Sequence, residues 1–504
     1  MAARRPNILV LMADQLSAGA LPAWGNPVAR APTLDRLAEG GVLFRNFHCV
    51  SPLCAPARAV LMSGLLPSRS GVYDNAAHFA ADIPTFAHYL RAAGYRTILA
   101  GKMHFCGPDQ LHGFEERLTT DIYPADFGWT PDWSAPEARP DWYHNMSSVT
   151  EAGLCVRTNQ IDYDEEVAFT AQRALFDIAR GSDERPFCLV VSFTHPHDPF
   201  AITAEYWNLF DHAAVDMPRF PDPPAPEDAH SRRVRRVIAA DAGPVTPAQI
   251  RRARHAYYAE IAYVDALMGK VRTAFDASGL ADGAVTIALA DHGEMLGERG
   301  LWYKMNFFEP ASRIPFVLHA PAMFSPRVVE GAASMVDVLP TLAALAHGGA
   351  EPDYALPVDG RSLLAECSGG GTDGAVGEYL AEGALAPIVM IRRGRWKFVH
   401  SPADPDQLYD LVADPDEREN CAGRVPAVAE AFRAEVARRW DLAALDRAVR
   451  ESQRRRLLVA PALRQGRNRA WEFQPFVDAS EQYMRNHIKL DDLEARSRFP
   501  RVGA

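Results

Sequence analysis

The sequence contains no apolar stretch long enough to span a lipid bilayer, which argues against an integral membrane protein. Arg4 and Arg5 precede an apolar run from Ile8 to Ala13, as in the first part of a secretory signal, but Asp14 ends that run too early. We therefore expect a cytoplasmic protein with no membrane partner.

Excess positive charge is also missing. Lysine and arginine together number 53 against 64 aspartates and glutamates, which gives a formal net charge of -11. Proteins that bind nucleic acid usually present a basic face to the phosphates, so no nucleic-acid partner is expected. The arginine-rich run 231–236 alternates with apolar residues and is interpreted as the solvated face of a helix.

Cysteine is scarce and irregularly spaced. The chain has seven cysteines, an odd number, and no two of them have CxxC spacing. This pattern argues against a disulfide framework and against a structural zinc site. Most of these cysteines are interpreted as small buried apolar residues.

Apolar residues make up 48% of the 504 residues, enough for a large core and more than one domain. The runs 7–13, 187–193 and 285–290 predict strands buried on both faces, and apolar residues spaced by three or four along 257–271 predict a helix. Strands alternating with helices indicate an α/β sheet covered on both sides. Polar residues follow each run, and active sites in such folds collect at the carboxyl ends of strands.

A glycine-rich stretch at 368–374 predicts a flexible joint after a catalytic domain of residues 1–370. A small domain is expected at 375–450, and a terminal extension at 451–504. The small domain should contain strands at 387–391 and 396–400, a turn at 404–406 and a helix at 426–439. The extension is too aromatic for a disordered tail and is expected to pack on another surface; its aromatic residues are Trp471, Phe473, Phe476, Tyr483 and Phe499.

Cys54 precedes a run of good helix formers, and Pro56 suits the first turn of a helix. Cys54 should therefore lie at a helix N-terminus, a location that favours bound anions. The pattern Cys54-x-Pro56-x-Arg58 resembles the signature of sulfatases, in which a modifying enzyme oxidises the cysteine to formylglycine.

Further segments appear in the order found in sulfatases, so the resemblance covers almost the whole chain. They are Asp14 after the first strand, Gly101-Lys102-Met103-His104, Pro196-His197-Asp198-Pro199, Asp291-His292-Gly293, Lys304 and Leu408-Tyr409-Asp410-Leu411. The resemblance implies an alkaline-phosphatase-like α/β sandwich. In that fold a large mixed sheet is flanked by helices and joined by a small C-terminal α+β domain and a terminal extension.

Hydrolysis of a sulfate ester needs a hard cation and fixed positive donors around the transferring group. The metal ligands implied here are Asp14, Cys54, Asp291 and His292, and the donors are Arg58, Lys102, His197 and Lys304. By resemblance, a hydroxyl of hydrated formylglycine at residue 54 attacks sulfur. His197 and Lys304 then assist the departing alcohol, and His104 removes the proton that allows sulfate to leave.

The metal pattern departs from the commonest sulfatase pattern at Gln15, where a second aspartate often stands, and at His292, where asparagine often stands. Fewer carboxylates and one imidazole favour a transition metal more than a purely oxygen-ligated site does. The expected metal is therefore calcium or manganese.

Four segments, at 107–115, 121–131, 143–145 and 192–199, are closely similar to choline sulfatases. The substrate implied is choline-O-sulfate, whose quaternary ammonium must be held by aromatic faces and carboxylates. The implied substrate-binding residues are Trp129, His144, Asn145 and Glu382. The tail is expected to form a homo-oligomer, a dimer or tetramer, in which Asp491 or Asp492 reaches a partner's pocket.

Three alternatives stay open at this stage. The same machinery would serve a phosphonate monoester or phosphodiester hydrolase, or a sulfatase of other alkyl or aryl sulfates. An unmodified relative would merely bind cationic osmolytes. Taken singly, Asp14 and Asp291 could be helix caps and Trp129 a core aromatic.

Overall fold

The computed structural model describes residues 5–371, 373–467, 470–476, 489 and 492. Its centre is an eight-stranded mixed sheet in the order β12-β2-β11-β9-β1-β7-β4-β5. The strands are β1 (Ile8–Ala13), β2 (Val42–Phe44), β4 (Arg96–Gly101), β5 (Glu116–Arg117), β7 (Phe187–Ser192), β9 (Val285–Ala290), β11 (Phe316–His319) and β12 (Arg327–Val329). The three apolar runs of the sequence are thus confirmed as the strands β1, β7 and β9.

These three strands are neighbours and run parallel, with β1 between β7 and β9. Every residue in them is buried, which explains why they are apolar throughout instead of alternating. Because they are parallel, their carboxyl ends meet at one edge of the sheet. The sheet becomes mixed at β11, which pairs antiparallel with both β9 and β2.

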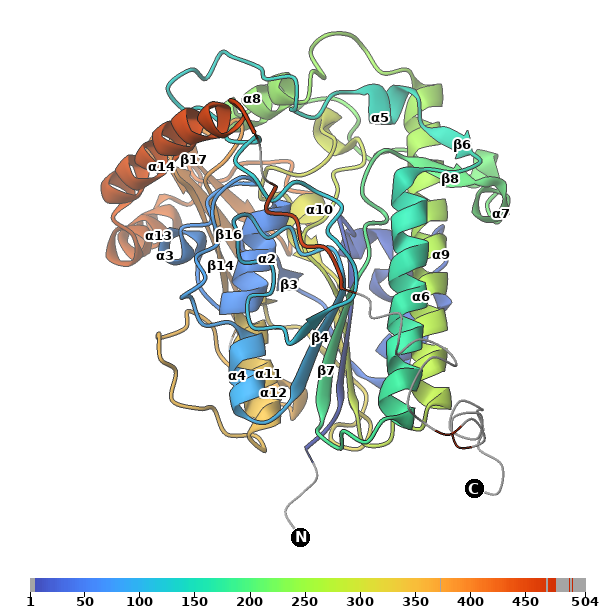
Figure 1. Ribbon diagram of the computed structural model, residues 1–504. Helices are drawn as coiled ribbons and strands as arrows, with labels where there is room; N and C mark the ends of the chain where they lie inside the picture. Colours follow the sequence, from blue (N-terminus) through green and yellow to red (C-terminus); the bar gives the residue numbers. More distant parts are fainter. Residues whose placement is uncertain (1–4, 372, 468–469, 477–488, 490–491, 493–504) are drawn as a thin grey trace.

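Helices cover both faces of the sheet, as Figure 1 shows. The long helices α6 (Asn159–Arg180) and α9 (Pro247–Ala277) lie against one face. The other face carries α2 (Cys54–Ser63), α4 (Phe86–Ala92) and α11 (Val338–Ala346). The predicted helical period at 257–271 falls inside α9, which begins with a capping box at Thr246 and a proline in its first turn.

Shorter elements connect these layers. The helices are α1 (Pro32–Gly40), α3 (Pro67–Ser70), α5 (Ser147–Thr150), α7 (Ala204–Trp207), α8 (Ala229–Val237), α10 (Glu309–Ser312) and α12 (Leu364–Cys367). The strands are β3 (Phe47–His48), β6 (Gly153–Cys155), β8 (Ala201–Thr203), β10 (Arg313–Ile314) and β13 (Ala333–Ser334). The arginine-rich run lies in α8, whose valines face inward.

A second, antiparallel sheet follows the glycine-rich stretch, in the order β14-β15-β16-β17. Its strands are β14 (Ala375–Tyr379), β15 (Ile388–Arg393), β16 (Trp396–Ser401) and β17 (Asp404–Asp410), and α13 (Pro426–Arg439) packs on it. The two predicted strands and the helix are confirmed. The turn predicted at 404–406 is wrong: Ser401 pairs with Asp404, so the turn is residues 402–403 and β17 begins at Asp404.

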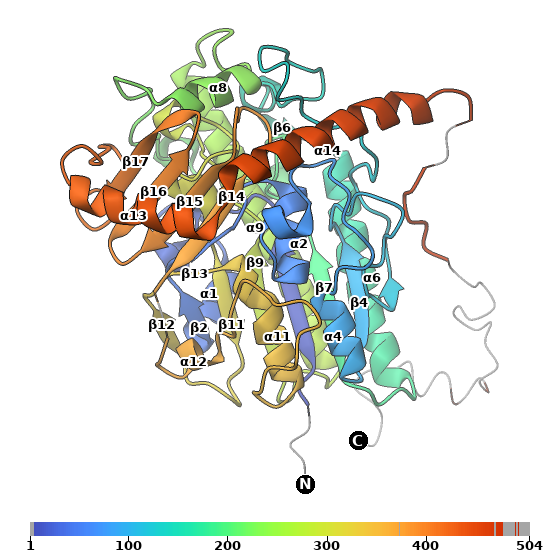
Figure 2. The ribbon, with the colours of Figure 1, turned by 90° about the vertical axis from the view of Figure 1, so that its left-hand side faces the viewer.

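The chain then forms α14 (Leu442–Leu463), which crosses the front of the molecule in Figure 2. Residue 451 lies inside this helix, and the division into three domains stays a prediction. Beyond α14, the Trp471 ring meets the Phe127 ring edge-on at 5.2 Å, whereas Phe476 is 89% exposed. The predicted tail residues Tyr483, Asp491 and Phe499 lie outside the described residues.

Among the residues that the structure describes, none of the helices combines the length and the apolar character needed to cross a bilayer.

Candidate active site

The carboxyl ends of β1, β7 and β9 meet the N-terminus of α2, and the residues predicted to carry chemistry gather there. Asp14 follows β1, and Asp291 and His292 follow β9. The Cys54 Sγ atom lies 3.1 Å from His292 Nε2 and 3.9 Å from Asp14 Oδ1. Residues distant in the sequence are brought together by strand order, as expected for an α/β sheet.

Cys54 is the first residue of α2, and every residue of that helix is buried. The N-cap residue makes no side-chain cap. Asn75 Oδ1 instead accepts a hydrogen bond from the Ala55 backbone N–H at 2.9 Å. Burial, and then the charge of Asp14, raises the pKa of the Cys54 thiol to about 12. The side chain encoded in the sequence is therefore a protonated thiol, a weak nucleophile.

Arg58 lies one helical turn beyond Cys54, and its guanidinium joins the ends of three strands. Its Nε donates to Asp291 Oδ2 at 2.9 Å and its Nη2 to Asp14 Oδ2 at 3.1 Å. Its Nη1 donates to Ser192 Oγ at 2.9 Å. Arg58, which was predicted to be a sulfate donor, thus holds the carboxylates of Asp14 and Asp291 in place. A planar guanidinium is well suited to this, because its N–H groups point in fixed directions.

Asp14, Cys54, Asp291 and His292 each offer a ligand atom, and these atoms all lie within 4.8 Å of one another. His292 Nδ1 donates to the Gly293 carbonyl at 3.1 Å, which leaves the Nε2 lone pair facing the cluster. Burial lowers the pKa of His292 to about 4, so the ring is neutral. Burial alone would raise the pKa of Asp14, but Lys102 and neighbouring cations hold it well below its usual range. Two carboxyl groups beside a neutral imidazole fit a divalent cation.

Gln15, one of the two departures from the common pattern, is fully buried beside this cluster. Its Oε1 accepts a hydrogen bond from Lys304 Nζ, and its Nε2 donates to Glu294 Oε2 at 2.5 Å. Its backbone N–H donates to Asp291 Oδ1 at 3.0 Å. Gln15 therefore links Asp291, one of the possible metal ligands, to Lys304.

Two fully buried lysines supply positive charge on either side of Cys54. Lys102 forms an ion pair with Asp14, and its Nζ lies 3.7 Å from Cys54 Sγ and 4.1 Å from the centre of the Tyr123 ring. Lys304 Nζ donates to His197 Nε2 at 2.9 Å. The charges of both lysines act on Cys54, so the start of α2 lies in a field that favours an anion.

His197 is held as a neutral ring. Its Nδ1 donates to the Asp198 carbonyl at 2.7 Å, so its Nε2 is the acceptor that faces Lys304. Burial, followed by the charge of Lys304, holds the pKa of His197 well below its usual range. A second cluster of possible ligands, made by His144, His197 and Asp198, lies at this side of the site.

His104 presents two ring nitrogens that are buried and have no hydrogen-bond partner among the described residues. The residue has φ 53°, and its backbone N–H donates to Asp121 Oδ2 at 2.9 Å. Burial, and then the charge of Lys102, lowers the pKa of His104 to about 3. An unprotonated ring with free nitrogens is suited to accept a proton from a bound group.

An aromatic wall, formed by Tyr123, Trp129 and Trp142, borders His104. The Trp129 ring lies 5.7 Å from the His104 ring and 5.3 Å from the Tyr123 ring, and it stacks on Trp142 at 6.5 Å. Trp129 is only half-buried. Its partial exposure and its contact with His104 distinguish it from a core aromatic, and an electron-rich ring face there can attract a cation.

The other predicted substrate residues lie in three different settings. His144 Nε2 is 3.5 Å from Lys304 Nζ. Asn145 is exposed, and its Oδ1 accepts a hydrogen bond from the Ser147 backbone N–H at 2.8 Å, so the side chain faces its own turn. Glu382 is buried and lines a cavity of about 100 Å³ together with Tyr143. Burial, and then the charge of Asp74, raises the pKa of Glu382 to about 7.

Three buried or half-buried residues support the site without having been predicted. Tyr123 contacts Lys102 and His197. Asp121 accepts hydrogen bonds from the backbone N–H groups of residues 103 and 104, and Asp164 accepts from Thr194 N–H and from His195 Nδ1, each at 2.7 Å. Tyr123 and Asp121 belong to a segment singled out in the sequence, but nothing marks Asp164, a residue inside α6.

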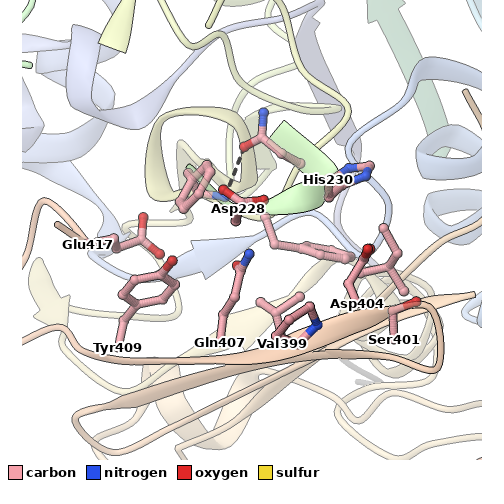
Figure 3. A pocket seen from close by; sticks show the side chains of 13 residues that line it. Asp228, His230, Val399, Ser401, Asp404, Gln407, Tyr409 and Glu417 are labelled. Carbon is pink, nitrogen blue, oxygen red and sulfur yellow. Dashed lines mark hydrogen bonds between the residues drawn. The ribbon is translucent and has the colours of Figure 1, made fainter. Parts of the chain in front are cut away.

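A separate cavity lies where the second sheet packs on the segment after Lys304 (Figure 3). Its labelled lining residues come from α8, β16, β17 and the loop beyond, and Asn306 and Phe307 complete it from the catalytic side. Its volume is about 30 Å³, the size of one water molecule. This cavity is a packing gap and cannot hold a sulfate ester.

Comparison with known proteins agrees with the fold and the cluster of site residues. Residues 6–349 match the family model described as sulfatase, and residues 447–499 match the one described as choline sulfatase enzyme C terminal. The chain therefore belongs to the sulfatase family, the enzymes that hydrolyse sulfate esters. It is 48% identical to the choline-sulfatase of Rhizobium meliloti (strain 1021), across 99% of this chain and 100% of that protein.

More distant relatives carry other names. The chain is 27% identical to arylsulfatase K of Xenopus laevis, across 84% of this chain and 80% of that protein. The crystal structure of the phosphonate monoester hydrolase of Agrobacterium radiobacter superposes with a TM-score of 0.68 at 26% identity, covering 86% of this chain and 95% of that one. The expected sulfatase-like fold is confirmed.

Proposed function

We propose that this sulfatase hydrolyses choline-O-sulfate to choline and sulfate. The observation that carries the proposal is the 48% identity to a choline-sulfatase over almost the entire chain. The site supports it, because an aromatic wall stands next to a cluster of buried cations. A sulfate group and a quaternary ammonium a few bonds apart need these two environments side by side.

Residue 54 supplies the nucleophile in this proposal. The modifying enzyme that recognises Cys54, Pro56 and Arg58 oxidises the cysteine to formylglycine, whose hydrate offers two hydroxyl groups. One hydroxyl attacks sulfur, the S–O bond to choline breaks, and the net result is transfer of one proton from that hydroxyl to the departing choline oxygen. Lys102 and Lys304 stabilise the negative charge on the sulfuryl oxygens. His197 holds the Lys304 ammonium through its Nε2, and Lys304 donates a proton to the departing alcohol oxygen.

Release of sulfate needs a base for the remaining hydroxyl. His104 meets this need because its ring is unprotonated and its nitrogens have no protein partner among the described residues. Transfer of the hydroxyl proton to His104 lets the aldehyde reform as the C–O bond to sulfate breaks. Water then hydrates the aldehyde for the next cycle.

A divalent cation, calcium or manganese, completes the site. Asp14, residue 54, Asp291 and His292 would hold it, and its charge would stabilise the sulfate oxygens and the hydroxyl of residue 54. Arg58 orients Asp14 and Asp291 for this purpose. The mixture of oxygen ligands with one imidazole is compatible with either ion.

The choline end is assigned to Trp129, His144, Asn145 and Glu382. Trp129 offers a ring face to the trimethylammonium group, and ionised Glu382 offers a negative charge. Asn145 would have to turn its side chain from the Ser147 N–H toward the substrate.

We further propose a cytoplasmic homo-oligomer, a dimer or tetramer. Phe476, in the tail beyond Gln465, is 89% exposed, and covering so large an apolar side chain in an assembly would be favourable. Light scattering of the full chain and of a chain ending at Gln465 would test this. An unchanged mass with unchanged affinity for substrate would contradict the role of the tail.

A phosphonate monoester hydrolase is the second candidate, favoured by the structural similarity to the Agrobacterium enzyme. The two functions are separated by turnover of three substrates by the modified enzyme: choline sulfate, 4-nitrophenyl sulfate and a phenylphosphonate monoester. The proposal expects the largest specificity constant for choline sulfate. A larger value for the phosphonate, or no choline released, would contradict it.

A further inference from the structure

Arg456, on α14, has a buried guanidinium between two segments of the catalytic part. Its Nη1 and Nη2 donate to the two carboxylate oxygens of Asp74, each at 2.7 Å. The same Nη1 donates to Thr130 Oγ1 at 3.0 Å. The Arg456 side chain is 6% exposed and that of Asp74 is fully buried, so the pair is sheltered from water.

The first of these partners, Asp74, belongs to the segment that contacts the residue after Cys54. Asp74 precedes Asn75, whose Oδ1 accepts the hydrogen bond from the Ala55 backbone N–H. Ala55 is the residue after Cys54, at the start of α2. The fork of Arg456 thereby fixes the segment that orients the first turn of this helix.

The second partner leads to the aromatic wall. Thr130 follows Trp129, and its hydroxyl donates to the Phe127 carbonyl at 2.8 Å while it accepts from Arg456. One guanidinium is therefore bonded to both the segment behind residue 54 and the segment that carries Trp129.

Two further residues of α14, the long helix in the foreground of Figure 2, bind neighbouring segments of the catalytic part. Gln453 Oε1 accepts a hydrogen bond from the Trp133 N–H at 2.9 Å. Arg450 donates to the Trp133 carbonyl at 3.0 Å and to the Leu385 carbonyl at 2.6 Å. The loop of Leu385 also carries Glu382, so α14 is bonded to two of the three predicted choline-binding segments, those of Trp129 and Glu382.

We propose that Arg456 is a positioning residue that sets the distance between residue 54 and Trp129, and that it thereby selects small cationic sulfate esters. This inference rests on the proposed function. A bidentate bond to a buried carboxylate fixes direction as well as distance, and a lysine cannot reproduce both of its bonds. The C-terminal helix thus controls specificity within its own chain, besides any contact that it makes with another subunit.

Three variants test this role. Arg456→Lys keeps the charge but loses the fork, and Thr130→Val removes only the bond toward the aromatic wall. Arg455→Ala is the matched control, because Arg455 is the neighbouring arginine, 67% exposed, and forms an ion pair with Glu451 on the helix surface. The measured quantity is the ratio of the specificity constants for choline sulfate and 4-nitrophenyl sulfate. Both specificity constants are proportional to the amount of folded, modified enzyme, so a loss of such enzyme does not change their ratio.

Arg456→Lys is expected to lower the ratio about tenfold, comparable to losing one cation–π contact. Thr130→Val should lower it by about threefold, the effect of one hydrogen bond. Arg455→Ala should leave it within about twofold of the wild type, as for other surface ion pairs. Light scattering on each variant should give the wild-type mass.

The outcomes distinguish the inference from the function on which it rests. A wild type without preference for choline sulfate overturns the proposed function. A wild type with that preference, combined with an unchanged ratio in Arg456→Lys and Thr130→Val, overturns the inference alone. An equal fall in Arg455→Ala, or a fall that accompanies loss of the oligomer, also overturns it, because either result assigns the effect to the helix surface or to assembly.

Discussion

The two ends of the site are built differently. The proposed sulfate end consists of fully buried charged residues near the carboxyl ends of neighbouring strands, and Arg58 bonds to the ends of three of these strands. The proposed choline end consists of half-buried aromatic residues on irregular segments, held from outside by α14. Chemistry common to a family thus lies on the rigid sheet, whereas the residues assigned to substrate choice lie on loops that a C-terminal helix supports.

The largest expected effect is at the sulfate end. Cys54→Ala should lower turnover of every sulfate ester by at least about 10⁴-fold, since the variant has no nucleophile. The fold should persist, because the change removes one buried sulfur at a helix start. Circular dichroism and thermal unfolding check the fold. Turnover that stays near the wild-type value for both choline and aryl sulfates would contradict the assigned role.

His104→Ala should lower steady-state turnover by about 10²–10⁴-fold, the usual contribution of a positioned acid or base. Because the first step does not use His104, one equivalent of alcohol should appear quickly before the enzyme stalls as a sulfated form. Rapid-quench kinetics and intact mass would detect that form. A variant that is slow from the first turnover, with no burst, would place His104 in the first step instead.

Trp129→Ala separates the two ends most clearly. Loss of a cation–π contact of about 0.5–2 kcal/mol should lower the specificity constant for choline sulfate on the order of tenfold. The constant for 4-nitrophenyl sulfate should change much less. An equal fall for both substrates would make Trp129 a general support of the site, and the choline assignment would lose its main physical argument.

The smallest expected effect is a pH dependence from Glu382. Its pKa is raised to about 7, so the carboxylate is charged above that pH and neutral below it. The charge of Asp74 raises this pKa and that of Lys304 lowers it, and Tyr379 Oη lies 3.5 Å from Glu382 Oε2. KM for choline sulfate should therefore fall a few-fold as pH rises from about 6 to about 8. Glu382→Gln should abolish this trend, and 4-nitrophenyl sulfate should not show it in either enzyme.

The gathering of Asp14, Asp291 and His292 could be predicted from sequence because these residues follow short, continuous apolar runs, the pattern typical of strands buried on both faces. Asp14 and Asp291 directly follow β1 and β9, and parallel strands bring such positions together whatever lies between them. The helix that begins at Cys54 could also be predicted, from Pro56 and the helix-forming residues after it. The turn predicted at 404–406 was wrong because Asp and Pro are also tolerated where β17 begins, at the outer edge of the sheet.

The support of the site could not be predicted in this way. Asp164 is one of several acidic residues along α6, and only the packing of that helix brings it to the Thr194 and His195 N–H groups. Arg456 stands among three consecutive arginines, and the sequence does not tell which of them is buried. Bonds between residues more than three hundred positions apart depend on the completed fold.

The most direct test of the account is the chemical state of residue 54 in active enzyme. The protein should be produced together with the modifying enzyme, digested, and analysed by peptide mass spectrometry alongside turnover of choline sulfate. The account predicts that the peptide carries an aldehyde in place of the thiol, and that turnover rises in proportion to the fraction converted. A fully active preparation whose peptide contains only unmodified cysteine would contradict it.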